Sequence, residues 1–368
     1  EADAWSMDIA RYGKFTENRE YIKQTTGQFY SRRFVMSYPN EQLPAGRDLK
    51  RTPVWKDQKE DGAIFGNSWG LEIPLMFGPK NFEEIPSLRR SNAFEHVKLE
   101  HLNVRDNVGM LDISGFSRFE VSGPGARDWL NHLFSTNIPE HGKAKLAVML
   151  GHDGRLKGDL TCFNWGANQF WIMGSYYLRE WHMRWFHDHL PGGIRDLKIS
   201  GHVEVRDISD NICGYSLSGP NSRKVLEKLT SSDVSNDYFK FMNCKEMDIG
   251  LIRSKVGRLS VAGELGYEIN CHALELSVLR EQLIEAGMNP DVSVVSAIFQ
   301  SFGDAPGGIT EEWRELMYSL GFEYWYNNQF AFRGGYFHEH NLKGGRKYFT
   351  MGAGLKMNVF EKIVNKNE

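Results

Sequence analysis

Two segments of the sequence share one pattern: Phe119-Glu120-Val121-Ser122-Gly123-Pro124 and Tyr215-Ser216-Leu217-Ser218-Gly219-Pro220. In each segment apolar and polar residues alternate, as in a β-strand with one buried face, and the strand ends at Gly-Pro. A helical pattern follows each Gly-Pro, over residues 125–130 and 221–226. The two copies are 96 residues apart (219 − 123), which is too long for a solenoid repeat. The sequence therefore predicts two related α+β lobes.

The rest of the chain fits this interpretation. Helical patterns cover residues 91–101, 175–190 and 274–286, and strands are expected over 63–65, 71–73, 145–150, 160–165, 169–173 and 258–261. Alternating strands and helices with Gly-Pro and Gly turns favour α+β lobes over a doubly wound sheet.

Composition excludes several classes of protein. The chain has 368 residues, 41% of them hydrophobic and 25% charged, which is ordinary for a globular protein. Its net charge of −3 gives no attraction for nucleic acid, and no apolar run is long enough to insert into a membrane. The four cysteines form no C-x-x-C pair, so we expect a reducing compartment, the bacterial cytoplasm or the mitochondrial matrix. Because the chain begins at Glu1, we expect a removed leader or a longer parent chain.

Five short motifs together resemble one family. From about Asp3 to Gly287 the sequence is similar to the carboxy-terminal portion of dimethylglycine and sarcosine dehydrogenases, which contains a domain like the glycine-cleavage T protein, a tetrahydrofolate-binding aminomethyltransferase. Any one motif alone is weak, but their order and spacing are specific. They are Gly46-Arg47-Asp48-Leu49-Lys50, Gly62-Ala63-Ile64-Phe65-Gly66 with Trp69-Gly70-Leu71-Glu72, Val108-Gly109-Met110-Leu111-Asp112, Gly154-Arg155-Leu156-Lys157-Gly158-Asp159-Leu160-Thr161 and Gly263-Glu264-Leu265-Gly266-Tyr267-Glu268.

The resemblance implies a fold and a division into domains. The fold is a T-protein-like α+β fold of related lobes, preceded by an inter-domain segment of the dehydrogenase type. We expect that segment over residues 1–90, the two-lobed folate-binding domain over 91–290, and a diverged or truncated C-terminal lobe over 291–368. In the last part, Met317 and Ser319 replace a charged pair that is typical of the family.

The resemblance also implies the site residues. One carboxylate can accept both the amide N–H and the exocyclic amine of a pterin. The family's G-E-x-G motif assigns that role to Glu264, with Gly263, Gly266 and Tyr267 as further cofactor-binding residues, and its Asp-Leu-Thr strand makes Asp159 the catalytic carboxylate. Without the surrounding motifs, a solvated residue of a β-turn is the preferred interpretation of Glu264. The alternative for Asp159 is a solvated residue in the loop after Gly158.

The implied function is one-carbon transfer. Tetrahydrofolate traps a formaldehyde-level carbon from an N-methylated amine as 5,10-methylene-tetrahydrofolate, in a subunit or part of a flavin-dependent demethylating dehydrogenase. No G-x-G-x-x-G follows a strand, so FAD is expected only from a partner flavoprotein chain or a missing N-terminal domain. One alternative is a tetrahydrofolate-dependent O- or S-demethylase. The other is a non-catalytic scaffold or regulatory subunit, and the loss of the charged pair at Met317 and Ser319 favours this second alternative.

Two other patterns resemble a nucleophile motif and a metal site, but the sequence around them favours a structural role. Gly66-Asn67-Ser68-Trp69-Gly70 matches the G-x-S-x-G nucleophile elbow, but its flanks indicate strands where an elbow needs a strand and a helix. His182, His187 and His189 lie on one predicted helix; His182 and His189 share a face and His187 does not. We expect surface histidines on an amphipathic helix and no metal site.

Overall fold

The computed structural model describes residues 8–38, 41–260, 263–287, 318–326, 330–338 and 347–355. It has two compact units, residues 1–296 and 297–368, which are considered separately. Val261 and Met317 lie outside the described residues, as does the side chain of Ser319. The replacement of the charged pair by Met317 and Ser319 therefore remains an observation on the sequence.

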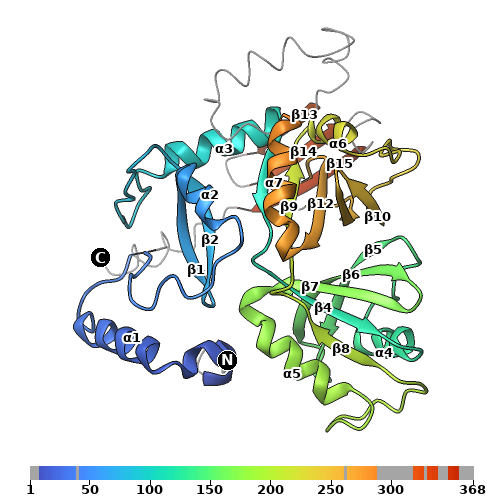
Figure 1. Cartoon of the computed structure of the whole chain (residues 1–368). Coiled ribbons are helices and arrows are strands. Elements are labelled where there is room, and N and C mark those ends of the chain that lie inside the picture. The colour runs from blue at the N-terminus through green and yellow to red at the C-terminus, as the bar shows by residue number, and fades with distance from the viewer. Residues whose placement is uncertain are drawn as a thin grey trace, which may run out of the picture. The chain divides into compact units, whose positions relative to one another are not determined.

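The first unit contains two five-stranded sheets of the same design (Figure 1). Their strand orders are β5-β6-β7-β4-β8 and β10-β11-β12-β9-β3, and each places a repeated strand next to last. The repeated strands are β4 (Phe116–Ser122) and β9 (Ile212–Ser218), followed by α4 (Ala126–Leu133) and α6 (Ser222–Leu229). Each of these bounds recurs 96 residues later, so the two related α+β lobes predicted from the sequence are confirmed.

The lobes exchange their edge strands. β3 (Gly109–Asp112) directly precedes β4 in sequence but pairs with β9 in the second sheet. β8 (Glu204–Asp207) directly precedes β9 but pairs with β4 in the first sheet. The chain therefore crosses between the sheets twice, at residues 113–115 and 208–211, and neither sheet is complete without the other half of the repeat.

Each sheet buries one face under its own helices. In the first lobe, Phe119, Leu160 and Ile172 pack against Trp129 of α4 and Phe186 of α5. The second lobe packs β9, β11 and β12 against α6 and α7 in the same way. Because side chains alternate along a strand, the opposite faces of both sheets carry the remaining residues. A third, smaller cluster joins those faces, with Phe163, Trp171 and Met173 of the first lobe against Cys244 of the second.

Within the N-terminal segment, a buried ion pair joins the loop that carries Arg47 to strand β2. Arg47 donates through Nε to Glu72 Oε1 at 2.8 Å, and its Nη2 donates to Glu72 Oε2 and to the Phe65 carbonyl. The Asp48 amide also donates to Glu72 Oε1. Glu72 is 1% exposed, so these donors, and not water, stabilise its negative charge. Two of the motifs of the sequence, around Arg47 and Glu72, are thus the two sides of one contact.

The G-x-S-x-G match lies in a β-hairpin. β1 (Ala63–Ser68) pairs antiparallel with β2 (Leu71–Phe77), and Trp69 and Gly70 form the turn with φ of 50° and 86°. The expectation that these flanks are strands is confirmed. In contrast, the strand expected over residues 258–261 is wrong for its described residues 258–260, because β11 ends at Gly257. Arg258 instead turns inward and donates to the Phe239 carbonyl at 2.7 Å.

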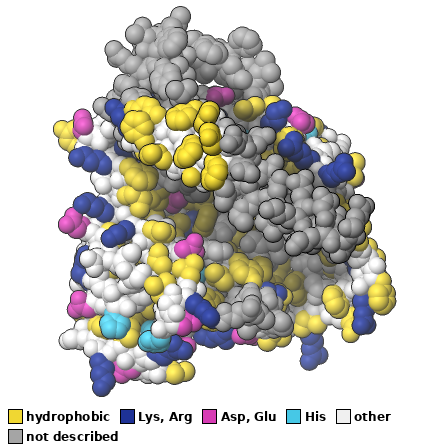
Figure 2. All heavy atoms as spheres, turned by 180° about the vertical axis from the view of Figure 1, so that it is seen from behind, with side chains coloured by type: hydrophobic (Ala, Val, Ile, Leu, Met, Phe, Trp, Pro, Cys, Tyr) yellow, Lys and Arg dark blue, Asp and Glu magenta, His cyan; other side chains and the backbone are white. Residues whose placement is uncertain are grey.

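The second unit is described as a three-stranded antiparallel sheet, β13-β14-β15. Pairing places Tyr324 opposite Phe332 and Tyr336 opposite Phe349, so aromatic residues share one face. Many of them are exposed, and hydrophobic side chains gather over this sheet when the molecule is seen from behind (Figure 2).

The remaining elements have the following bounds: η2 Ile9–Tyr12, η3 Lys14–Glu17, α1 Arg19–Ser31, α2 Trp55–Glu60, α3 Phe94–Asp106, β5 Ala144–Leu150, β6 Leu156–Gly166, β7 Gln169–Ser175, η4 Tyr176–Leu178, α5 Arg179–His189, β10 Cys244–Ile249, β11 Ile252–Gly257, β12 Gly266–His272, η5 Ala273–Glu275, α7 Leu276–Glu285, β13 Tyr318–Tyr326, β14 Phe330–His338 and β15 Lys347–Leu355.

Candidate functional site

The two sheets turn toward each other the faces that their own helices leave uncovered, and a cluster of side chains from both sheets packs there. On β6, Leu160 and Cys162 belong to the helix-covered core, so Asp159, Thr161 and Phe163 lie on the opposite face. On β12, Tyr267 and Ile269 belong to the core of the second lobe. Glu268 and Asn270 therefore share the face directed at the first lobe.

Glu268 is the carboxylate that this arrangement singles out. It is half-buried, and its side chain accepts no hydrogen bond from any residue that the structure describes. Burial raises the pKa of Glu268, and the charge of Arg118 opposes that rise. A carboxylate that is partly removed from water, with both oxygens unused, is suited to accept N–H donors from a ligand.

Asp159 lies on the same side of the first sheet as Phe163. A side chain at Gly257 would meet the Phe163 ring, and Gly257 pairs with Glu268, which places Phe163 close to Glu268. Asp159 is four residues farther along β6, about 13 Å at the usual rise of a strand. Its side chain is exposed. The structure thus puts Asp159 and Glu268 on facing sheets, with Asp159 toward the more open end.

Glu264 lies in the turn that leads into β12. Gly263 has a φ of 101°, which favours glycine, and its amide donates to Ser260 Oγ at 2.7 Å. A Cβ on Gly266 would lie 2.5 Å from the Leu259 carbonyl oxygen. Both glycines therefore serve a tight turn, and Glu264 is held half-exposed at its tip.

Tyr267 is placed differently from the expected cofactor-binding role. Its side chain is fully buried in the core of the second lobe and stacks on Phe239, with ring centroids 6.0 Å apart. Its hydroxyl accepts a hydrogen bond from Arg223 Nε at 3.0 Å. Strand alternation explains this, since a residue next to Glu268 must point to the other face.

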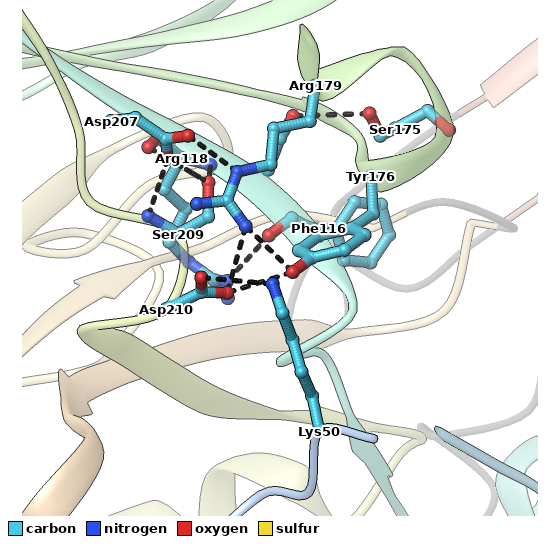
Figure 3. Close-up of polar contacts among 10 residues, drawn as sticks. Lys50, Phe116, Arg118, Ser175, Tyr176, Arg179, Asp207, Ser209 and Asp210 are labelled. Carbon is cyan, nitrogen blue, oxygen red and sulfur yellow. Dashed lines mark hydrogen bonds and ion pairs between the residues drawn. The ribbon is translucent and has the colours of Figure 1, made fainter. Parts of the chain in front are cut away.

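A network of charged residues holds the second crossing segment against the first lobe (Figure 3). Arg179, at the start of α5, donates to Asp207 at 2.5 Å and to Asp210 at 2.9 Å. The Tyr176 hydroxyl and Lys50 also contact Asp210, at 2.8 and 3.4 Å. These bonds fix both ends of residues 207–210, where the chain passes from one sheet to the other.

The histidines of α5 differ from the expectation. His187 is exposed, but His182 and His189 are only 1% and 6% exposed, so the expectation of surface histidines is wrong for these two. The helix face that they share packs on the first sheet. The aromatic residues of α5, such as Trp185 and Phe186, belong to the same core and bury this face. Burial lowers the pKa of His182 to about 4, against a smaller opposite effect of Asp159.

The residue that the sequence reasoning missed, Glu268, is the second glutamate of the same motif. The signal was present: Tyr267 and Ile269 are apolar neighbours of a single charged residue on an expected strand. Such a pattern predicts a carboxylate on the face opposite the core, whereas Glu264 belongs to the turn.

Comparison with known proteins agrees with this architecture. The family described as the GCVT N-terminal domain matches residues 54–297, and the FAD dependent oxidoreductase central domain matches residues 1–52. The crystal structure of glycine cleavage system aminomethyltransferase T from Bartonella henselae has a TM-score of 0.52 at 15% identity, covering 84% of this chain and 98% of that chain. This likeness supports the fold alone.

Curated relatives include two classes of enzyme. Human mitochondrial dimethylglycine dehydrogenase is 30% identical over 292 residues, which is 79% of this chain and 33% of that protein. The aminomethyltransferase of Anoxybacillus flavithermus is 27% identical over 246 residues, 66% of this chain and 60% of that protein. The chain spans about a third of the length of the dehydrogenase relatives that it matches.

Proposed function

The chain belongs to the family of the GCVT N-terminal domain, and from that premise we propose that it binds tetrahydrofolate between its two sheets and serves one-carbon transfer from an N-methylated amine. The observation that carries this proposal is the half-buried Glu268 carboxylate, which has no hydrogen-bond partner in the described part of the chain. The Asp159 carboxylate on the facing sheet supports it.

The residues present fit a reduced pterin. The two oxygens of Glu268 can accept an amide N–H and an exocyclic amine side by side, which is a geometrically selective, charge-assisted contact. Glu264, at the tip of the adjoining turn, is the second candidate for this contact. Phe163 and Trp171, packed between the sheets, keep water from that region.

Bound tetrahydrofolate would supply the nucleophilic nitrogens that take up a formaldehyde-level carbon as 5,10-methylene-tetrahydrofolate. The chain contributes orientation and charge. We propose that Glu268 or Glu264 fixes the ring and that Asp159 holds or moves a proton and stabilises positive charge on the one-carbon donor. Amine oxidation is assigned to FAD on a partner chain or another part of the protein.

The donor, by this proposal, is a small amine of the dimethylglycine or sarcosine type. The match of residues 1–52 to a domain of FAD-dependent oxidoreductases supports a flavoprotein context. All four cysteines are buried and unpaired, which fits the reducing compartment expected from the sequence. No helix among the described residues is long and apolar enough to cross a membrane.

The binding test uses calorimetry with 5-formyl-tetrahydrofolate, which resists oxidation and has the same pterin edge. We expect Glu268→Gln to weaken binding about 10- to 100-fold, since one of two charge-assisted bonds is lost. Glu264→Gln is the matched variant on the turn, and a larger loss there would assign the pterin to Glu264. No binding by the unaltered protein at millimolar ligand would favour the scaffold alternative.

The activity test separates the remaining alternatives. With a flavoprotein partner and dimethylglycine or sarcosine, 5,10-methylene-tetrahydrofolate is the expected product, whereas 5-methyl-tetrahydrofolate would indicate an O- or S-demethylase. Asp159→Asn should keep folate affinity within about threefold and reduce turnover by at least tenfold, in the range of a lost proton-transfer group.

A further inference from the structure

Arg118 occupies the point where the interlocked lobes meet. It is fully buried on β4, on the face opposite the helix-covered core. Its Nη2 donates to the Ile113 carbonyl at 2.9 Å, in the first crossing segment. Its own backbone amide donates to Ser209 Oγ at 2.9 Å, in the second crossing segment. One residue thus contacts both passages of the chain between the sheets.

The same guanidinium reaches the sheet of Glu268. Arg118 Nε donates to Asn270 Oδ1 at 3.1 Å, and Nη1 donates to the Phe116 carbonyl at 3.1 Å. Asn270 and Glu268 share a face of β12, with their Cα atoms about 7 Å apart. Among the described residues, the guanidinium donates to the Asn270 amide oxygen and to two backbone carbonyls, and none of these acceptors is charged. Its positive charge is therefore not cancelled by contact.

This arrangement has a chemical consequence. A direct Arg118–Glu268 ion pair would occupy the carboxylate oxygens, whereas Arg118 donates to the Asn270 amide oxygen instead and leaves both Glu268 oxygens free. The positive charge of Arg118 still acts on Glu268 without direct contact, because water screens charges only weakly in a buried region. We propose, on the basis of the proposed function, that Arg118 is a positioning residue, which holds strand β12 through Asn270 and directs its positive charge at Glu268 so that the carboxylate receives the pterin edge.

Other charged groups around Glu268 are directed elsewhere. Lys255, which pairs with Asn270 on β11, is bound to Glu246 and lies over the rings of Trp165 and Trp171. Asp112, on β3, accepts a hydrogen bond from Gln58 at 2.9 Å. The partner of Glu268 on β9 is the uncharged Ser216. Arg118 is the charge that opposes the rise in the pKa of Glu268 caused by burial.

Asn270→Asp tests the proposal with little change of shape. The new carboxylate keeps the hydrogen bond from Arg118 and cancels its charge, so the pKa of Glu268 should rise by about one unit. Binding of 5-formyl-tetrahydrofolate requires ionised Glu268 and is lost as pH falls. We therefore expect the pH at which binding is half lost to move up by about one unit, with less than threefold change in affinity at pH 8.

Asn236→Asp is the matched control. Asn236 also accepts a hydrogen bond from an arginine, Arg223, at 2.7 Å, but it lies on the other side of the second sheet. This variant should bind with the midpoint of the unaltered protein. Arg118→Lys keeps the charge and loses the fork of donors, so it should lower affinity without moving the midpoint.

A second readout separates this inference from the proposed function. In protein labelled with carboxyl-13C glutamate, the Glu268 signal, identified by its absence in Glu268→Gln, reports the pKa without ligand. A rise of about one unit in Asn270→Asp supports the role of Arg118 even if no folate binds. An unchanged pKa, or an equal loss of affinity at every pH, would overturn it.

Discussion

Replacement of His182 should make the protein more resistant to acid. Both ring nitrogens of His182 are buried without a hydrogen-bond partner, beneath the strand that carries Asp159. The ring lies between Phe119 and Phe186, and burial lowers its pKa from 6.5 to about 4. Because the folded state resists protonation, the unfolded state binds the proton first as pH falls. The neutral histidine thus costs stability between pH 6.5 and about pH 4.

The magnitude follows from the two pKa values. At pH 5 His182 is almost fully protonated in the unfolded state and almost fully neutral in the folded state. This difference lowers the free energy of unfolding by about 2 kcal/mol relative to pH 7. His182→Leu removes the titrating group, keeps helix propensity and matches the volume approximately. The difference in unfolding free energy between this variant and the unaltered protein should therefore grow by about 2 kcal/mol in favour of the variant between pH 7 and pH 5.

Urea denaturation followed by tryptophan fluorescence at several pH values measures this difference. His187→Leu, on the exposed face of the same helix, is the matched control and should show the pH dependence of the unaltered protein. If the stability difference for His182→Leu stayed constant from pH 7 to pH 5, the argument from burial would be refuted.

Further predictions concern the fold. Arg47→Met leaves the buried Glu72 carboxylate unpaired and should cost about 3–5 kcal/mol by urea denaturation, and the double variant with Glu72→Gln should recover part of that loss. Gly266→Ala places a Cβ against the Leu259 carbonyl and should lower the melting temperature by several degrees. Gly27→Ala, in helix α1 with open space around it, should instead raise the free energy of unfolding by about 0.5–1 kcal/mol. A lower free energy of unfolding in this variant would contradict a helical conformation at Gly27.

Local patterns predicted most of the secondary structure because they depend on residues close in sequence. The alternation ending at Gly123-Pro124 and Gly219-Pro220 predicted two related lobes, and the structure confirms them. The strand expected over 258–261 is absent from the described residues 258–260, where the buried Arg258 donates to the Phe239 carbonyl. Local alternation does not predict that contact, because its partners are 19 residues apart. The histidines of α5 failed for the same reason, since helix periodicity gives the face but not what covers it.

The candidate site divides in the same way. The sequence alone determined the α+β class, the repeat, the family resemblance and the motif that contains both Glu264 and Glu268, because these follow from residue order and local sterics. Only the tertiary structure decided that Glu268 lies between the sheets and Tyr267 in the core, and that Arg118 contacts both crossing segments and Asn270. Those facts depend on burial and on contacts between segments that are distant in sequence, such as Arg118 with Ser209 and with Asn270, 91 and 152 residues apart. The exchange of edge strands creates these contacts, and no local pattern encodes them.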